Sequence, residues 1–286
     1  MLLALDWTII KDKFCFLSIS WVLQSGRSIP LYFDGYEKLK LDYHFSQSSI
    51  EKKSLKNVLK ALSHIKDITI LGDRGFDSPA ILQLFIDHNV KFVVRAKIDK
   101  WLTLEDGSRF KVSHDLVKKG KREKILKVTY TEKNPVLLNF YAIWKVKQDE
   151  PWLLLSNIDS SVKQVASLYA SRWEIEEMFK SMKNQDIGFD IKTVKLRAMD
   201  RWLRLFFLAT IVFQFLGKLG KECREIPKIE RRYSLSSKPK KGRDFIFSIY
   251  NIAMKIIYDN EMKIRYYRKV FSFKYRSKEM QWVSLC

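Results

Sequence analysis

The chain has few of the residues that mark secreted or metal-clipped proteins. Its 286 residues include only three cysteines, Cys15, Cys223 and Cys286, an odd number without a Cys-x-x-Cys pair. This pattern argues against a disulfide framework and against a cysteine zinc site. The sequence opens without a basic segment or a small-residue cleavage site, so no secretory signal peptide is indicated. We therefore expect a protein of the reducing cytoplasm.

Long apolar runs are also lacking. The longest, residues 205–216, is interrupted by Gln214, and it falls short of the roughly 20 residues that a bilayer span requires. It predicts a buried helix, and we expect no membrane partner. Hydrophobic residues nevertheless make up 47% of the chain, which argues against general disorder and favours one large core with an insertion.

Acidic residues are scarce relative to basic ones. The chain has 53 lysine and arginine residues against 32 aspartate and glutamate residues, a net charge of +21. Such a charge attracts polyanions and makes their binding depend on salt. Nucleic acid is therefore the expected partner, while charge alone leaves a structural nucleic-acid binder and a membrane-surface protein as alternatives.

Apolar periodicity and turn residues predict the order of elements in the first hundred residues. We expect three antiparallel strands, a helix that ends near residue 64, a strand, a helix that begins at Ser78-Pro79, and a further strand. The predicted strands cover residues 2–8, 13–22, 29–33, 68–71 and 91–95. This order predicts an α/β fold with a mixed sheet flanked by helices, which is the ribonuclease H-like arrangement.

Periodicity changes further along the chain. Between about residues 100 and 156 the period of two returns, with candidate strands at 127–130, 140–146 and 152–155, which indicates a β-rich insertion. Helical spacing resumes at residues 162–182 and 199–219. We divide the chain into a first core part, an insertion, a second core part and a basic C-terminal region, at residues 1–98, 99–157, 158–220 and 221–286.

Two basic segments lie in the C-terminal region. Residues 227–243 combine lysine and arginine with serine and proline, and residues 263–278 interleave basic residues with Tyr266, Tyr267 and Tyr275. Both segments suit contact with a nucleic-acid backbone without sequence recognition. A solvated linker is the alternative interpretation.

Two aspartates follow apolar strands and are candidate metal ligands. Asp6 is placed at the end of the first strand, and Asp73 follows the run Ile-Thr-Ile-Leu-Gly. A buried carboxylate is costly unless a cation or hydrogen bonds compensate it, although either residue alone also suits an ordinary turn. Asp77 is a weaker candidate, because it precedes Ser78 and Pro79 and helix capping accounts for it.

Four polar residues share one face of a predicted helix: Tyr169, Arg172, Glu176 and Lys183. Their offsets of 0, 3, 7 and 14 residues fall within about 60° of arc at about 100° per residue. Glu174 and Glu177 point elsewhere and are expected to be solvated. Ordinary surface charge pairs along a helix are the alternative explanation.

Asp6, the Asp73-Arg74-Gly75 turn and this four-residue spacing resemble the DDE transposases of the insertion-sequence-four family, whose signature is Tyr-x2-Arg-x3-Glu-x6-Lys. Every signature position is present, and the text at residues 92–97 and 171–177 is also similar to that family. The resemblance runs from residue 1 to about residue 219. It implies a ribonuclease H-like catalytic core with a β-rich insertion between the second Asp and the Glu helix.

The resemblance also implies the chemistry. The carboxylates of Asp6, Asp73 and Glu176 would hold two divalent ions, and oxygen ligands favour Mg²⁺ with Mn²⁺ as a substitute. One ion would activate water or a terminal DNA hydroxyl, and the other would stabilise the leaving oxygen. The implied activity is cut-and-paste transposition, in which DNA strands are cleaved and transferred at transposon ends.

The same resemblance implies how DNA is held. Tyr169, Arg172 and Lys183 would bind phosphates of the transposon end. Trp152 is similar to the insertion-domain tryptophan that stacks on a flipped base, although a packed core tryptophan is the alternative and Trp101 and Trp144 are weaker candidates. The implied partners are double-stranded DNA of the transposon ends and the target, and a second copy of the chain in a synaptic complex, in a bacterial cytoplasm and at the nucleoid.

The sequence departs from the family at its start. Family members usually carry an N-terminal DNA-binding domain, whereas five residues precede Asp6. We therefore expect a truncated chain, whose retained activity is an open question. A ribonuclease H-like structure-specific nuclease and a non-catalytic DNA-binding remnant stay open as alternatives. The four histidines have no ligand spacing, and no role is assigned to them.

Overall fold

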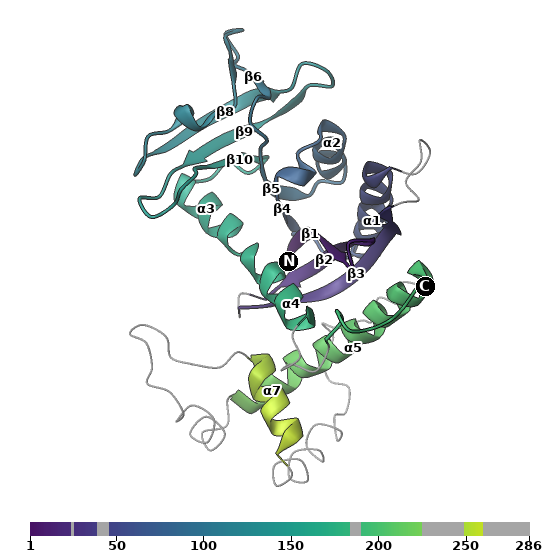
Figure 1. Cartoon of the computed structure of the whole chain (residues 1–286). Helices are drawn as coiled ribbons and strands as arrows, with labels where there is room; N and C mark the ends of the chain where they lie inside the picture. Colours follow the sequence, from purple (N-terminus) through teal and green to yellow (C-terminus); the bar gives the residue numbers. More distant parts are fainter. Residues whose placement is uncertain (24–25, 39–45, 184–189, 225–248, 260–286) are drawn as a thin grey trace.

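The computed structural model describes residues 1–23, 26–38, 46–183, 190–224 and 249–259. Within these ranges the centre of the molecule is a ten-stranded mixed sheet, in the order β3-β2-β1-β4-β5-β10-β9-β8-β6-β7 (Figure 1). The core strands are β1 (Leu2–Ile10), β2 (Phe14–Val22), β3 (Ser28–Glu37), β4 (Thr69–Gly72) and β5 (Lys91–Arg95). The others are β6 (Trp101–Thr103), β7 (Arg109–Lys111), β8 (Arg122–Tyr130), β9 (Val136–Ile143) and β10 (Trp152–Ser156). The basic segments at residues 227–243 and 263–278 lie outside the described residues.

The pairing of the first five strands confirms the predicted α/β arrangement. β1, β2 and β3 pair antiparallel, whereas β4 pairs parallel to both β1 and β5. The parallel connections run through helices α1 (Gln47–Ala61) and α2 (Pro79–Asp87), as parallel pairing requires. The third strand reaches Glu37, beyond the predicted residue 33, because it stays paired with β2 along its whole length.

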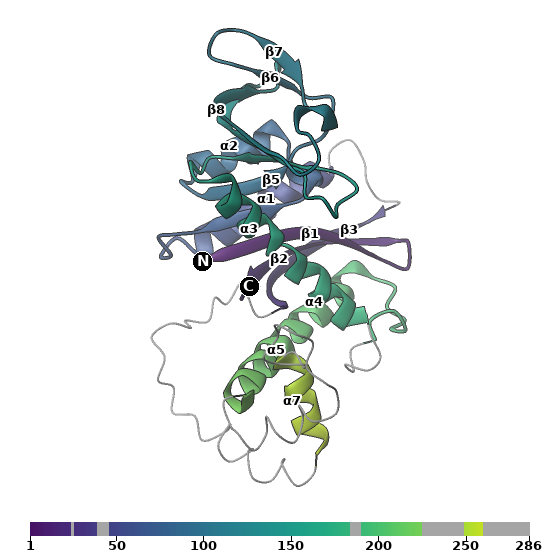
Figure 2. The ribbon, with the colours of Figure 1, turned by 90° about the vertical axis from the view of Figure 1, so that its left-hand side faces the viewer.

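Helices cover both faces of the sheet. On one face, α1 and α2 pack on alternate residues such as Leu3, Leu5 and Ile70. The opposite face carries residues such as Ala4, Leu71 and Val93, and four further helices cover it. These helices are α3 (Val162–Ala170), α4 (Trp173–Lys183), α5 (Met199–Arg224) and α7 (Ile249–Tyr258). Figure 2 shows two of them, α3 and α4, in front of the strands. Both faces of the core sheet are buried. Successive residues of a strand point to opposite faces, so the position of a residue along its strand determines which set of helices it contacts.

The strand-rich region between residues 100 and 156 continues the same sheet. β10 pairs with β5 on one side and with β9 on the other, and β8 and β6 follow. The short hairpin β6–β7 and the 3₁₀ helix η3 (His114–Leu116) were not predicted. The face of the core sheet that lies under α3 therefore extends across these strands.

Helix α5 departs from the expectation of a fully buried helix. It buries Phe206, Phe213 and Leu216, but it exposes Phe207 by 60% and Leu208 by 57%. The prediction holds for one face only: α5 packs against the sheet on one side (Figure 1) and leaves these two side chains exposed. Residues 199–223 are long and apolar enough to cross a membrane by length and composition, a criterion that helices packed in a protein core also meet.

Candidate active site

Parallel pairing places the two predicted aspartates level with each other. β1 and β4 pair in a register that joins Ala4 to Leu71, and Asp6 and Asp73 each lie two residues further along the chain. Because alternate residues of a strand share a face, Asp6 points toward the same side as Ala4, under α3 and α4. The sequence placed Asp6 at the end of its strand, which is wrong, since β1 continues to Ile10 through its pairing with β2.

A tight turn fixes Asp73. Its Oδ1 accepts the backbone N–H of Gly75 at 2.8 Å and thereby caps the 3₁₀ helix η2 (Arg74–Phe76). A Cβ at Gly75 would lie 2.9 Å from Asp73 Oδ1, so a side chain there would push the carboxylate away. Pairing of β4 with β5 joins Leu71 to Val93, and Arg95 is therefore level with Asp73 on the next strand.

The helix that was predicted to carry the third carboxylate is two helices. The N–H groups of Arg172 and Ile175 bond to the carbonyl oxygens three residues earlier, of Tyr169 at 3.0 Å and of Arg172 at 3.1 Å. These bonds are of the tighter 3₁₀ type, and they separate α3 from α4. A single helix over residues 162–182 is therefore wrong. Tyr169 ends up on α3, Arg172 at the break, and Glu176 and Lys183 on α4.

Arg172 joins two of the predicted carboxylates. Its Nη1 lies 3.6 Å from Asp6 Oδ2, and its Nη2 donates a hydrogen bond to Glu176 Oε1. The side chains of Arg172 and Asp6 are only 16% and 17% exposed, so this contact is shielded from water. Burial lowers the pKa of Arg172, but attraction by Tyr169, Asp6 and Glu176 outweighs it, and the pKa is raised overall.

The three predicted acids form one electrostatic group. The pKa of Asp6 is raised to about 6, first by burial and then by the negative charges of Asp73 and Glu176, while Arg172 and the N–H of Trp7 oppose the rise. Each of the other two carboxylates is therefore close enough to repel that of Asp6. A site with this excess of buried negative charge favours a cation.

Lys183 reaches the same face of β1 from the end of α4. Its Nζ donates to Thr8 Oγ1 at 2.6 Å, and Thr8 lies two residues after Asp6 and is buried. Burial lowers the pKa of Lys183, Lys192 lowers it further, and Asp6 opposes the change. Within the described ranges no ion pair of Lys183 is found. Thr8 was not identified from the sequence, although its position two residues after Asp6 places it on the same face.

The structure also brings Trp152 next to Tyr169. Their ring centroids are 5.1 Å apart with an interplanar angle of 74°, and the Arg172 guanidinium lies 6.0 Å from the Tyr169 centroid. Trp152 is half-buried at the start of β10, and the ammonium of Lys145 lies 4.4 Å over its ring. Tyr169 thus lies between Trp152 and Arg172, which contacts the carboxylates.

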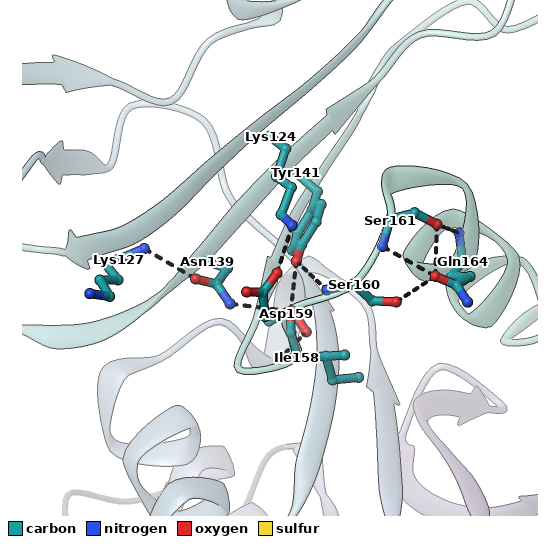
Figure 3. Close-up of polar contacts among 10 residues, drawn as sticks. Lys124, Lys127, Asn139, Tyr141, Ile158, Asp159, Ser160, Ser161 and Gln164 are labelled. Atoms are coloured by element: carbon teal, nitrogen blue, oxygen red, sulfur yellow. Dashed lines mark hydrogen bonds and ion pairs between the residues drawn. The ribbon is translucent and has the colours of Figure 1, made fainter.

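The start of α3 is held by the sheet extension (Figure 3). The hydroxyl of Tyr141 on β9 donates to the carbonyl oxygen of Ile158 at 2.6 Å. A capping box joins Ser161 and Gln164 at the first turn of α3, which satisfies N–H groups that would otherwise lack partners. These contacts fix where α3 begins and so where Tyr169, at its other end, can lie.

Asp77 is a structural carboxylate. It is buried, and its Oδ2 accepts the Tyr130 hydroxyl at 2.6 Å and the Lys97 backbone N–H at 2.9 Å. The predicted capping role is wrong, because Ser78 is the N-cap of α2. The carboxylate is satisfied by these donors, which leaves Asp73 as the candidate of the pair for a metal site.

Glu174 was expected to be solvated, and this is wrong. It is 8% exposed, and its two carboxylate oxygens accept the N–H groups of Leu23 at 3.2 Å and Gly26 at 3.3 Å. The sequence signal for this burial is the four-residue spacing to Met178, a core residue one turn later on the same face of the helix.

Glu51 on α1 was also not singled out. It is buried, accepts the indole N–H of Trp7 at 2.8 Å, and has a pKa raised first by burial and also by Asp73.

The donor set suits a divalent cation. Asp6, Asp73 and Glu176 supply only carboxylate oxygens, which are the ligands that hard cations prefer. Burial, and then the charges of Asp73 and Glu176, raise the pKa of Asp6. In the side-chain conformations of the described residues, no three acidic, histidine or cysteine groups converge closely enough to hold a metal. Asp6 and Glu176 turn toward Arg172 instead.

Comparison with known proteins identifies the family of the chain. Among solved structures, the crystal structure of human ENDOV matches at 12% identity and a TM-score of 0.33, over 71% of this chain and 84% of that chain. The comparison with curated proteins gives no match. The sequence model of a family described as "Transposase DDE domain" matches residues 24–212. Because that match covers more than half of the chain, the chain belongs to the transposase DDE domain family.

Proposed function

We propose that the chain is a transposase catalytic core of the insertion-sequence-four kind, which cleaves DNA strands at transposon ends and joins them to target DNA. The observation that carries the proposal is geometric: Asp6 and Asp73 lie level on neighbouring strands, and Arg172 joins Asp6 to Glu176. Membership of the transposase DDE domain family supports a phosphoryl-transfer activity on nucleic acid.

The three carboxylates would hold two divalent ions, Mg²⁺ or Mn²⁺, which supply an activated water or hydroxyl nucleophile and stabilise the leaving oxygen. The residues of this chain provide the frame. Asp6 and Asp73 lie on neighbouring strands whose spacing is fixed by the sheet, whereas Glu176 comes from α4 above them. Arg172 partly neutralises the charges of Asp6 and Glu176, and this reduces the repulsion between the carboxylates.

Cationic and aromatic groups beside the carboxylates suit DNA. We propose that Tyr169, Arg172 and Lys183 bind phosphates next to the cleaved bond and that Trp152 stacks on an unpaired base. The hydroxyl partner of Lys183 leaves its charge available to a phosphate, and stacking on an aromatic ring is tolerant of base identity. The net charge of +21 supports long duplex DNA as the partner. A pair of chains acting together at the bacterial nucleoid belongs to the same proposal.

The experiment measures Mg²⁺- and Mn²⁺-dependent cleavage and joining on the end DNA of the element that encodes the chain. The parent is compared with Asp6→Ala, Asp73→Ala and Glu176→Ala, and with Glu177→Gln as a control on the same helix. We expect activity in the parent and in the control, and losses of at least about 1,000-fold in the three alanine variants. A parent that binds DNA but never cleaves it would identify a non-catalytic binding protein and refute the proposal.

A structure-specific nuclease is separated by the same assay. Such an enzyme would use similar carboxylates without needing Lys183 beside them. Cleavage that is specific for transposon ends and is lost in Lys183→Ala supports the transposase. Cleavage of branched or nicked DNA that survives in Lys183→Ala would favour the nuclease.

A further inference from the structure

Helix α4 contacts the β2–β3 hairpin on the side opposite Glu176, its candidate catalytic residue. Glu174 and Glu176 are two residues apart, which places them about 160° apart around a helix of about 100° per residue. Glu176 bonds to Arg172 above β1, whereas Glu174 is buried against the connection between β2 and β3. One acidic residue therefore points to the site and the other points away from it.

Contacts with the β2–β3 hairpin run along α4 for two turns. Near the start of the helix, the Glu174 carboxylate accepts two backbone N–H groups, and the Ser28 hydroxyl donates to the Glu174 carbonyl oxygen at 3.4 Å. Seven residues later on the same face, Arg27 Nε donates to Ser181 Oγ at 2.6 Å. Between them, the sulfur of Met178 accepts from the Ser20 hydroxyl at 3.5 Å.

The Glu174 carboxylate contacts are directional, as is the Arg27–Ser181 hydrogen bond, and of these the Glu174 contacts lie closer along the helix to Glu176. Apolar contacts such as those of Met178 tolerate small slides and turns, because dispersion and burial are weakly directional. A carboxylate with each oxygen bonded to a different N–H group is held along two directions. One of these N–H groups belongs to Gly26, which has a φ of +90°, a conformation that favours glycine.

We propose that Glu174 is a positioning residue that sets the rotation of α4 and thereby places Glu176 over Asp6 and Asp73. The inference rests on the proposed function, since it assigns Glu176 to the metal site. Glu174 does not touch the reacting groups. It affects the reaction indirectly: Glu174 and Glu176 are two residues apart on α4, so a rotation of the helix at Glu174 also moves Glu176.

The variants are Glu174→Gln, which keeps the shape and one acceptor oxygen, and Glu174→Leu, which keeps neither acceptor. Glu177→Gln is the matched control, because Glu177 is an acid of the same helix that pairs with Lys180 at the surface. Circular dichroism and the thermal unfolding midpoint show which variants are folded. Glu174→Gln keeps the test decisive if Glu174→Leu does not fold.

Two readouts report on position. The first is cleavage at saturating DNA as a function of Mn²⁺, together with DNA affinity measured in EDTA. We expect Glu174→Gln to lower the rate about 10-fold and to raise the half-saturating Mn²⁺ concentration several-fold, with DNA affinity unchanged. The second is the rise in the thermal unfolding midpoint of DNA-free protein on adding Mn²⁺, which should be smaller in Glu174→Gln than in Glu177→Gln.

The outcomes separate this inference from the proposed function. If Glu174→Gln matches Glu177→Gln in both readouts while the parent cleaves DNA, the positioning role is refuted and the transposase proposal stands. Activity that falls only in proportion to the folded fraction, with the Mn²⁺ dependence unchanged, also refutes it. If the parent never cleaves DNA, the proposed function fails, and the Mn²⁺-induced shift of DNA-free protein still decides the role of Glu174.

Discussion

Replacing Asp6 by asparagine should stabilise the folded chain at neutral pH when divalent ions are absent. Burial, with the charges of Asp73 and Glu176, raises the pKa of Asp6 from 3.8 to about 6. A difference of about 2 between the folded and unfolded pKa corresponds to about 3 kcal/mol, at about 1.4 kcal/mol for each unit. The ionised aspartate thus lowers the free energy of unfolding, whereas a neutral asparagine does not.

The pH dependence follows from the direction of the shift. The folded state binds the proton of Asp6 more tightly, so the penalty is absent below about pH 3.8, where both states are protonated. It grows between pH 3.8 and about 6 and is fully present above that range. The 3.6 Å contact with Arg172 is already included in this shift, because it lowers the pKa of Asp6. The net gain expected at pH 8 is therefore about 3 kcal/mol.

Urea unfolding in EDTA at pH 8 and at pH 4.5 measures this effect. The gain from Asp6→Asn should be largest at pH 8 and should shrink at pH 4.5. Asp77→Asn is the matched control, because it makes the same chemical change in a buried aspartate that has its own donors, and it should destabilise the chain at pH 8. A loss of stability in Asp6→Asn at pH 8, or an equal change at both pH values, would refute the reasoning.

Three further results are expected. Millimolar Mn²⁺ should reduce or reverse the advantage of Asp6→Asn at pH 8, as seen by the unfolding midpoint, because the cation stabilises the parent site; an unchanged advantage would argue against a metal at Asp6. Lys183→Ala should weaken binding to all DNA sequences and lower the slope of log affinity against log salt by about 1, measured by fluorescence anisotropy, and an unchanged slope would contradict a phosphate contact. Asp77→Ala should lower the free energy of unfolding by about 3 to 5 kcal/mol and Tyr130→Phe by about 1 to 2 kcal/mol, since each leaves a buried hydrogen-bonding partner of the pair at 2.6 Å unsatisfied; urea unfolding with both losses below 1 kcal/mol would show that the bond is unimportant.

Much of the fold could be predicted from local patterns. Apolar runs separated by turn residues marked β1, β2 and β3, and apolar residues at a 3.6-residue period marked α1, because burial imposes these patterns on the chain. The residue types and spacing of Asp6, Asp73 and Glu176 could also be recognised, since they are properties of the chain itself. Because alternate residues of a strand point to opposite faces of the sheet, the sequence also indicated which residues of a strand share a face.

Tertiary structure decided where these residues meet. The level placement of Asp6 and Asp73 depends on the register of β1 against β4, which is set by pairing between residues about 67 apart in the sequence. The break at Arg172 could not be predicted from helical periodicity, because 3₁₀ and α-helical turns differ by only a fraction of a residue per turn. Glu174 was expected to be solvated on the isolated helix, whereas in the folded chain its carboxylate accepts N–H groups of the β2–β3 connection, which favours its burial. The sequence therefore determined which acids are available, and the packing of α4 between the hairpin and β1 determined which one faces the site.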